Sequence, residues 1–80
     1  MTLLKLFYRD GCHLCEDMLE QLQQLQREQM FPLELVDVDR DPATQARYND
    51  IVPVLENGDG IQLSEYFLDE AGLRRYLQGG

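Results

Sequence analysis

The sequence predicts an α/β fold in which a four-stranded mixed sheet is flanked by helices, in the order βαβαββα. Short apolar runs alternate with stretches of helical period, and an Asn57-Gly58 turn separates two of these runs. The first strand, helix and strand form a crossover unit, so their strands are expected to be parallel, as in ~98% of such units. The chain of 80 residues has room for one small domain, residues 1–80, since domains usually have ~100 to 200 residues.

The first strand and the first helix show the clearest patterns. Residues 2–8 are apolar on both faces apart from Lys5, which is typical of a central strand covered by helices on both sides. The period then changes, and residues 13–29 are predicted to form an amphipathic helix that rests on the sheet. Its apolar stripe consists of Leu14, Met18, Leu22 and Leu25, with Leu19 beside it.

A second strand and a short helix are expected next. Residues 33–38 carry apolar side chains on both faces, which favours a strand. Asp41 and Pro42 then have the character of an N-cap and a first-turn residue. The helix that they begin is predicted to continue over 43–49.

The C-terminal part is expected to form a hairpin and a closing helix. Residues 51–56 and 61–63 flank the Asn-Gly turn and should pair as antiparallel strands. Residues 65–77 are predicted to form the last helix, which Gly79 and Gly80 end. Gly72 would lie in the middle of this helix.

The charge of the chain excludes several classes of partner. Fifteen acidic residues against seven basic ones give a formal net charge of -8, the wrong sign for binding nucleic acid or an anionic membrane. No apolar run approaches the ~20 residues of a membrane helix, and residues 1–9 lack the features of a signal peptide. We therefore expect a cytoplasmic, monomeric protein with no nucleic-acid or membrane partner.

Cys12 and Cys15 give the strongest functional signal. Two cysteines are too few for a disulfide scaffold, so a pair with two residues between them indicates redox or metal chemistry. The pair falls where the first strand meets the first helix, and backbone N–H groups with the helix dipole stabilise a thiolate there. Cys12 is expected to be exposed at the helix start. Cys15 should lie one turn further in, close enough to attack a mixed disulfide on Cys12.

Other interpretations of the cysteine pair remain open. Tetrahedral zinc needs four ligands, whereas the chain has two cysteines and a single histidine, His13, which lies between them. We expect His13 to be an exposed, partly protonated spacer rather than a general base. A metal or cluster shared by two chains, or two simply buried cysteines, would also fit the spacing. The position at a strand-to-helix junction favours redox chemistry, and no metal site is expected.

Three segments, in order along the chain, match one known family. They are Tyr8-Arg9-Asp10-Gly11-Cys12-His13-Leu14-Cys15-Glu16, then Val36-Asp37-Val38-Asp39 followed by Asp41-Pro42, and then Val52-Pro53-Val54-Leu55. On these segments the chain resembles the glutaredoxin branch of the thioredoxin-fold family, especially short bacterial glutaredoxin-like proteins with a Gly-Cys-His-Leu-Cys-Glu motif. The resemblance implies a thioredoxin-like fold and thiol-disulfide oxidoreductase activity.

The resemblance also implies roles for individual residues. Cys12 would be the nucleophile and Cys15 the resolving thiol. Pro53 would follow a cis peptide bond, which would place the backbone of Val52 beside Cys12 to hold an extended thiol substrate. Arg9 takes the position at which glutaredoxins often carry a lysine near the glutathione carboxylate.

Two parts of the chain differ from the usual glutaredoxin pattern. His13 and Leu14 replace the common Pro-Tyr pair between the cysteines. After the fourth strand, Leu63-Ser64-Glu65-Tyr66 takes the place of the Gly-Gly turn and acid that bind the γ-glutamyl end of glutathione. Ser64 and Glu65 are expected to supply a helix-start anion site or a partner for an amine. The expected substrate-binding residues are therefore Arg9, His13, Val52, Pro53, Ser64 and Glu65.

The sequence leads to two hypotheses. The first is an oxidoreductase that reduces protein or low-molecular-weight disulfides through Cys12 and Cys15. It would hold no bound cofactor and would use glutathione as reductant or co-substrate, and its partner would be a disulfide-bearing protein or a glutathione mixed disulfide. The second is a thioredoxin-fold binding module that recognises a partner beside Pro53. The second thiol favours the enzyme, because a binding module needs no resolving cysteine.

Overall fold

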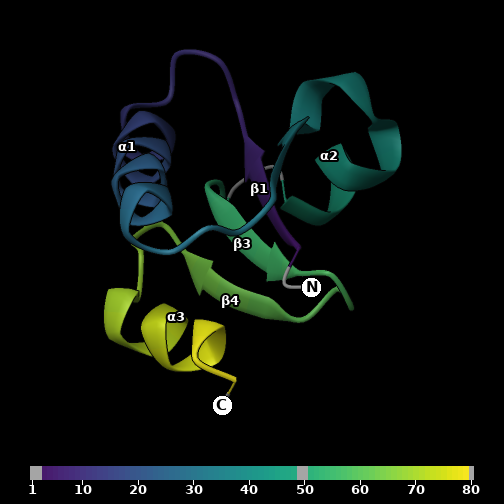
Figure 1. Ribbon diagram of the computed structural model, residues 1–80. Helices are drawn as coiled ribbons and strands as arrows, with labels where there is room; N and C mark the ends of the chain where they lie inside the picture. Colours follow the sequence, from purple (N-terminus) through teal and green to yellow (C-terminus); the bar gives the residue numbers. More distant parts are fainter. Residues whose placement is uncertain (1–2, 49–50, 80) are drawn as a thin grey trace.

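The computed structural model describes residues 3–48 and 51–79, and the order of its elements confirms the βαβαββα prediction (Figure 1). A short 3-10 turn, Val38–Arg40, follows the second strand. The other elements are β1 (Leu4–Tyr8), α1 (His13–Glu28), β2 (Leu33–Asp37), α2 (Pro42–Tyr48), β3 (Val54–Asn57), β4 (Gln62–Glu65) and α3 (Glu70–Leu77).

The sheet has the order β2-β1-β3-β4, with β1 in a central position as predicted. β1 runs parallel to β2 and antiparallel to β3, and β3 pairs antiparallel with β4. Leu4 at the start of β1 lies opposite Asn57, while Phe7 near its end lies opposite Val54. The β3–β4 turn and the segment that follows β1 therefore lie at opposite ends of the sheet.

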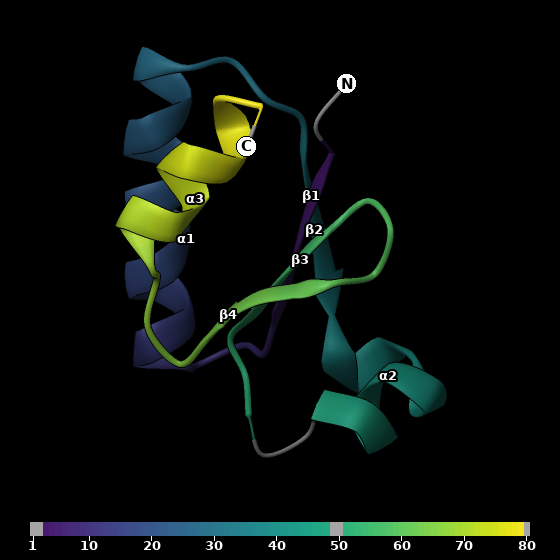
Figure 2. The same cartoon turned by 90° about the horizontal axis from the view of Figure 1, so that it is seen from below.

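Helices cover both faces of the sheet. Figure 2 shows α1 and α3 on one side and α2 on the other. Alternation along β1 sends Leu6 into the first layer and Phe7 into the second, as the two-residue period of a strand requires. The first layer contains Leu4, Leu6, Met18, Leu22, Leu25, Phe31, Leu55 and Leu73, and the second contains Phe7, Val38, Tyr48 and Val54.

The buried stripe of α1 differs from the predicted stripe at one position. Met18, Leu22 and Leu25 are buried as expected, but Cys15 takes the place of Leu14, which is only half-buried.

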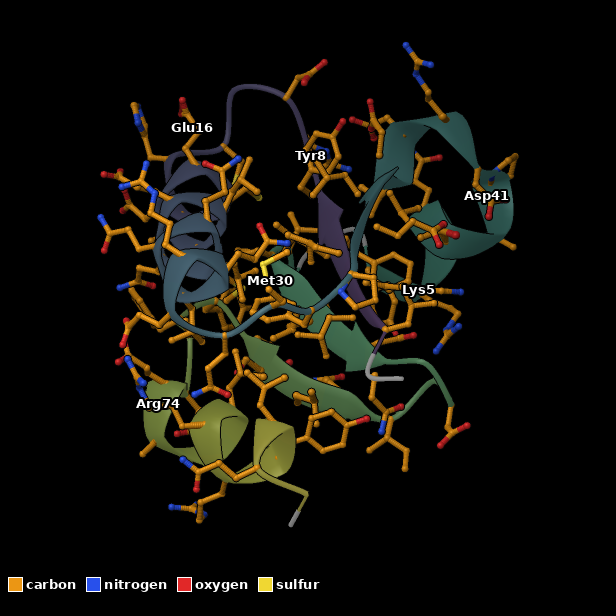
Figure 3. The ribbon with its side chains drawn as sticks, in the orientation of Figure 1. Lys5, Tyr8, Glu16, Met30, Asp41 and Arg74 are labelled. Carbon is orange, nitrogen blue, oxygen red and sulfur yellow. The ribbon has the colours of Figure 1, made fainter. Side chains whose placement is uncertain are left out.

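An ion pair also connects α1 and α3, the two helices on this face of the sheet. Arg74 of α3 donates to Glu28 of α1 at 3.2 Å and to Glu70 at 3.0 Å, and its place on α3 is labelled in Figure 3.

The predicted start of the last helix at residue 65 is wrong. β4 extends through Glu65, and α3 begins at Glu70. Between them the chain makes a tight three-residue turn, in which the Phe67 N–H donates to the Glu65 carbonyl at 2.7 Å. Tyr66, the central residue of this turn, has a φ of 65°, a conformation that non-glycine residues rarely adopt. The apolar pattern of the segment resembled a helix, but its backbone does not continue as one.

Asp69 is the N-cap of α3. Its carboxylate accepts the Gly72 N–H at 3.0 Å, and its own N–H donates to the Ser64 hydroxyl at 3.0 Å. A Cβ atom on Gly72 would lie 2.4 Å from the Asp69 Oδ2 atom. Gly72 therefore lies in the first turn rather than in the middle of the helix, where it gives the capping carboxylate room.

The start of the third strand also differs from the prediction. β3 begins at Val54 rather than at residue 51. The Ile51 N–H donates to the Tyr48 carbonyl in the turn after α2, and Pro53 has no N–H to pair. The expected end of the α2 segment at residue 49 and the expected start of the first strand at residue 2 lie outside the described residues.

α2 is fastened to the sheet by a buried carboxylate. Glu56 on β3 is 4% exposed, and its Oε2 atom accepts hydrogen bonds from the Tyr48 hydroxyl and the Arg47 guanidinium. The Tyr48 ring packs against Phe7 with centroids 4.9 Å apart, and the Arg47 guanidinium lies 4.7 Å over it. Since a buried carboxylate must keep its hydrogen bonds, the Tyr48 hydroxyl links α2 to the sheet in addition to the packing of its ring.

Replacing Tyr48 by phenylalanine should lower the free energy of unfolding by about 2 kcal/mol, the typical contribution of a hydrogen bond to a charged group. Urea unfolding under reducing conditions measures the effect. Tyr76→Phe provides the control, because Tyr76 is partly exposed on α3 and water can hydrate its surroundings. Equal losses in the two variants would contradict the role given to the Tyr48 hydroxyl.

Candidate functional site

The cysteine pair lies at the junction of β1 and α1. The chain leaves β1 through a turn in which Gly11 has a φ of 77°, a backbone conformation that glycine adopts without steric penalty. Cys12 follows with extended dihedral angles, φ −97° and ψ 111°, and is the N-cap of α1. The turn therefore places Cys12 at the start of α1.

One hydrogen bond joins the two cysteines. The backbone N–H of Cys15 donates to the Cys12 Sγ atom over 3.2 Å. Cys12 is partly exposed, whereas Cys15 is only 3% exposed. The two thiols thus differ in access to solvent, and only the outer one can meet a large substrate directly.

The pKa of the Cys15 thiol is raised from 9.0 to about 12, and burial is the largest cause. A hydrogen bond with Cys12 contributes to this rise, and a hydrogen bond with the Arg9 backbone acts in the opposite direction. Burial disfavours the charged form of an acid, since a thiolate loses its hydration there. Cys15 is therefore a neutral thiol at physiological pH, and Cys12 is the thiol that another molecule can reach.

Arg9 is engaged with Asp39 of the 3-10 turn. Its Nε atom lies 3.0 Å from Asp39 Oδ2 and its Nη2 atom 3.0 Å from Oδ1, a two-pronged contact. The hydrogen bond from Arg9 is the largest cause that lowers the pKa of the Asp39 carboxyl, and the amide of Gln45 acts in the same direction. Arg9 thus ties the end of β1 to the turn after β2. A role in binding substrate stays a prediction.

The other expected binding residues at this end are His13, Val52 and Pro53. The His13 side chain is 97% exposed, and its Nδ1 atom lies 3.8 Å from Glu16. The peptide bond between Val52 and Pro53 is cis, and both residues precede the end of β3 that pairs with the end of β1. These residues therefore lie at the same end of the sheet as the cysteines.

The expected helix-start anion site at Ser64 and Glu65 is not formed. Both residues lie within β4, five residues or more before the first residue of α3. The Ser64 hydroxyl is buried and accepts the Asp69 N–H. Glu65 is exposed, and its carboxylate accepts a hydrogen bond from the Gln62 amide at 3.0 Å. Ser64 thus holds the β4–α3 loop in place.

Two hollows flank α1, and the sequence predicted neither. The larger, of about 320 Å³, lies between α1 and the loop after β4. The smaller, of about 190 Å³, includes Arg9, Cys15 and Leu35. Tyr8 and Glu16, which also line it, lie at the same end of the molecule in Figure 3. Tyr66 and Phe67, two consecutive aromatic residues shortly after the predicted strand 61–63, were the available signal for the larger hollow, but they fell inside the expected helix.

The described part of the chain contains neither a cluster of metal-ligating side chains nor a membrane helix. Among residues 3–48 and 51–79, no three His, Cys, Asp or Glu side chains gather closely enough to hold a metal ion. No helix within these residues is long and apolar enough to cross a membrane.

Comparison with known proteins identifies the family. Residues 3–78 match the family model of the glutaredoxin-like domain (DUF836). The chain belongs to this glutaredoxin-like family. None of the curated protein sequences is similar to it at a significant level.

Solved structures agree with this membership. The solution structure of protein Ne2328 from Nitrosomonas europaea has 38% identity and a TM-score of 0.83, over 94% of this chain and 89% of that one. The crystal structure of protein XcR50 from X. campestris has 32% identity and a TM-score of 0.76, over 96% and 97%. A point mutant of thioredoxin from Halobacterium salinarum has 31% identity and a TM-score of 0.65, over 98% and 73%. The glutaredoxin-like domain therefore has the thioredoxin fold.

Iodoacetamide should alkylate Cys12 well before Cys15 at neutral pH. Cys15 is 3% exposed and remains protonated, while alkylation needs an accessible thiolate. Peptide mapping after a short exposure of the reduced protein measures the order. The same exposure in urea, where burial is lost, should label both cysteines. Early labelling of Cys15 in the folded protein would contradict the assignment of the outer thiol.

The raised pKa of Cys15 should make part of the protein's stability depend on pH. The native state holds this proton more tightly than the unfolded chain, so the stabilisation is complete below the unfolded pKa of 9.0 and is lost as pH rises toward about 12. The difference in unfolding free energy between the reduced glutaredoxin-like domain and its Cys15→Ala variant should therefore shrink between about pH 8 and about pH 11. A difference that stayed constant over this range would show that Cys15 titrates normally.

Proposed function

We propose that this glutaredoxin-like domain is a dithiol-disulfide oxidoreductase that reduces protein or low-molecular-weight disulfides. The observation that carries the proposal is the contrast between the two thiols. Cys12 is partly exposed at the start of α1 and accepts a backbone N–H there, while Cys15 lies buried one turn further in. An accessible nucleophile with a protected second thiol is what stepwise disulfide exchange requires.

The reaction runs through a mixed disulfide. The Cys12 thiolate attacks one sulfur of the substrate disulfide, and the other substrate sulfur leaves as a thiolate. Cys15 then gives up its proton and attacks Cys12, which releases the second substrate thiol and leaves an intrachain disulfide. The substrate gains two electrons and two protons, and the dithiol of the protein is oxidised. A thiol reductant such as glutathione returns the protein to the dithiol form.

The environment of Cys15 sets the order of these steps. In the dithiol form, burial and the hydrogen bond to Cys12 both keep Cys15 protonated. Once Cys12 is bound in a mixed disulfide, its sulfur carries no charge, so the coulombic effect that also raises the pKa of Cys15 is removed. Cys15 therefore becomes easier to ionise at the stage at which it must attack.

The expected glutathione contacts belong to the same proposal. Arg9, His13, Val52 and Pro53 lie at the same end of the sheet as the cysteines. Among these, Arg9 already shares its guanidinium with Asp39. Glutathione can act as the reductant through its thiol alone, because this exchange requires access to a sulfur rather than a dedicated carboxylate site.

Titration of the reduced protein with oxidised glutathione tests the proposal. Intact mass after acid quenching should show a loss of about 2 Da, the two hydrogens of a new disulfide, and dithiothreitol should reverse it. Cys15→Ser should stop at a glutathione adduct on Cys12, and Cys12→Ser should form neither product at a comparable rate. Failure to form an intrachain disulfide at any glutathione ratio would instead favour the thioredoxin-fold binding module.

A further inference from the structure

The larger hollow is a groove that starts beside the redox centre. One wall is α1, and the other is the loop that leaves β4 and runs along this helix (Figure 2). We call it the α1–loop groove. Its apolar lining is Leu14, Met18, Tyr66, Phe67 and Leu68, and its acidic rim is Asp17 and Glu20.

Each wall of the groove is connected to the end of the sheet at which the two thiols lie. Leu14 lies between the two cysteines in the first turn of α1. On the opposite wall, the Tyr66 N–H donates to the Pro53 carbonyl at 2.9 Å. A chain whose disulfide reaches Cys12 can therefore place neighbouring residues in the groove.

The aromatic side chains of the groove are open to solvent. Phe67 is 72% exposed and Tyr66 is 38% exposed. Exposed aromatic side chains that gather in one groove are typical of a surface that contacts another molecule. Burying a phenylalanine surface is among the larger single contributions available to binding.

The charge of the groove indicates which kind of molecule can bind there. Asp17 and Glu20 are exposed on its rim, and no lysine, arginine or histidine is among its nine lining residues. The whole chain also carries a net charge of -8, which attracts cations and repels anions at low salt. Glutathione has two carboxylates and no large apolar side chain, so it does not match this surface.

We infer that the α1–loop groove docks polypeptide substrates that carry a large apolar side chain and an adjacent lysine or arginine close to the disulfide. This inference rests on the proposed oxidoreductase function and names its substrate class. The apolar side chain packs on Phe67 and Leu14, and the basic side chain pairs with Asp17 or Glu20. The electron balance is that of disulfide exchange, since docking only places the sulfur of the substrate near Cys12.

The test uses two synthetic cyclic peptide disulfides that differ at one position. In one, a phenylalanine and a lysine follow the first cysteine, and in the other glutamate replaces the lysine. The rate at which each oxidises the reduced protein gives the preference in turnover. Fluorescent versions with serine for both cysteines give the affinity by anisotropy, without any redox step.

The lysine peptide should bind and react about fivefold better than the glutamate peptide, because the lysine can form one exposed ion pair while the glutamate is repelled by the acidic rim. Phe67→Ala should weaken binding of the lysine peptide by about tenfold, the effect of losing one buried aromatic contact. The double variant Asp17→Asn with Glu20→Gln should remove the preference between the peptides, and high salt should do the same.

Matched controls come from the other end of the sheet. Ile61→Ala removes a side chain that is 59% exposed near the β3–β4 turn, and Glu34→Gln with Asp59→Asn removes two exposed charges outside the groove. Neither control should change the affinity for the lysine peptide. An effect of these controls as large as that of the groove variants would overturn the inference, because net charge or general hydrophobicity would then explain the binding.

The outcomes separate the groove from the redox function. Normal reduction of both peptides with no effect of Phe67→Ala would overturn the groove and leave the oxidoreductase in place. Selective binding of the lysine peptide without reduction of either disulfide would support the groove and refute the oxidoreductase. A dimer that Phe67→Ala converts to a monomer would show that a second copy of the chain occupies the groove, and this result would also overturn the inference.

Discussion

The hydrogen bond from the Cys15 backbone to the Cys12 sulfur is the contact on which both the start of α1 and the proposed chemistry depend. The first N–H groups of any helix have no partner within the helix. Here a thiol takes the place that serine, threonine or aspartate usually fills at an N-cap. The proposed nucleophile, Cys12, is therefore also the cap of α1.

The surrounding elements hold this junction in place. β1 is hydrogen-bonded on both sides, to β2 and β3, so the strand that leads into the turn is fixed in position. Arg9, just after the end of β1, forms a salt bridge with Asp39. This contact joins segments that lie 30 residues apart in the sequence. Cys15 then enters the buried stripe of α1. The same packing that stabilises the helix on the sheet thus keeps the second thiol protonated.

Local sequence patterns predicted the features whose determinants are consecutive in the chain. The central β1, the first helix and the hairpin follow from periodicity or turn residues, and the position of the cysteines follows from a strand, a turn and a helix in succession. The start of α3 was not predictable, because Tyr66 has a backbone conformation that sequence signals through glycine, and a hydrogen bond to Pro53 fixes its loop. The Arg9–Asp39 pair and the exposed Phe67 likewise depend on segments that no local pattern connects. Tertiary contacts therefore decide which apolar side chains form the core and which remain available to a partner.

The two hollows on either side of α1 have different relations to the thiols. The smaller includes Cys15 and Arg9, and the α1–loop groove shares no lining residue with it. In the proposed function, the reactivity of the pair would arise from the backbone at the helix start and from the burial of Cys15. Recognition in the groove would arise from exposed side chains such as Phe67 and Asp17, which contribute little to the core. Substitutions in the groove can therefore change which partners dock while the helix start continues to supply the same thiol chemistry.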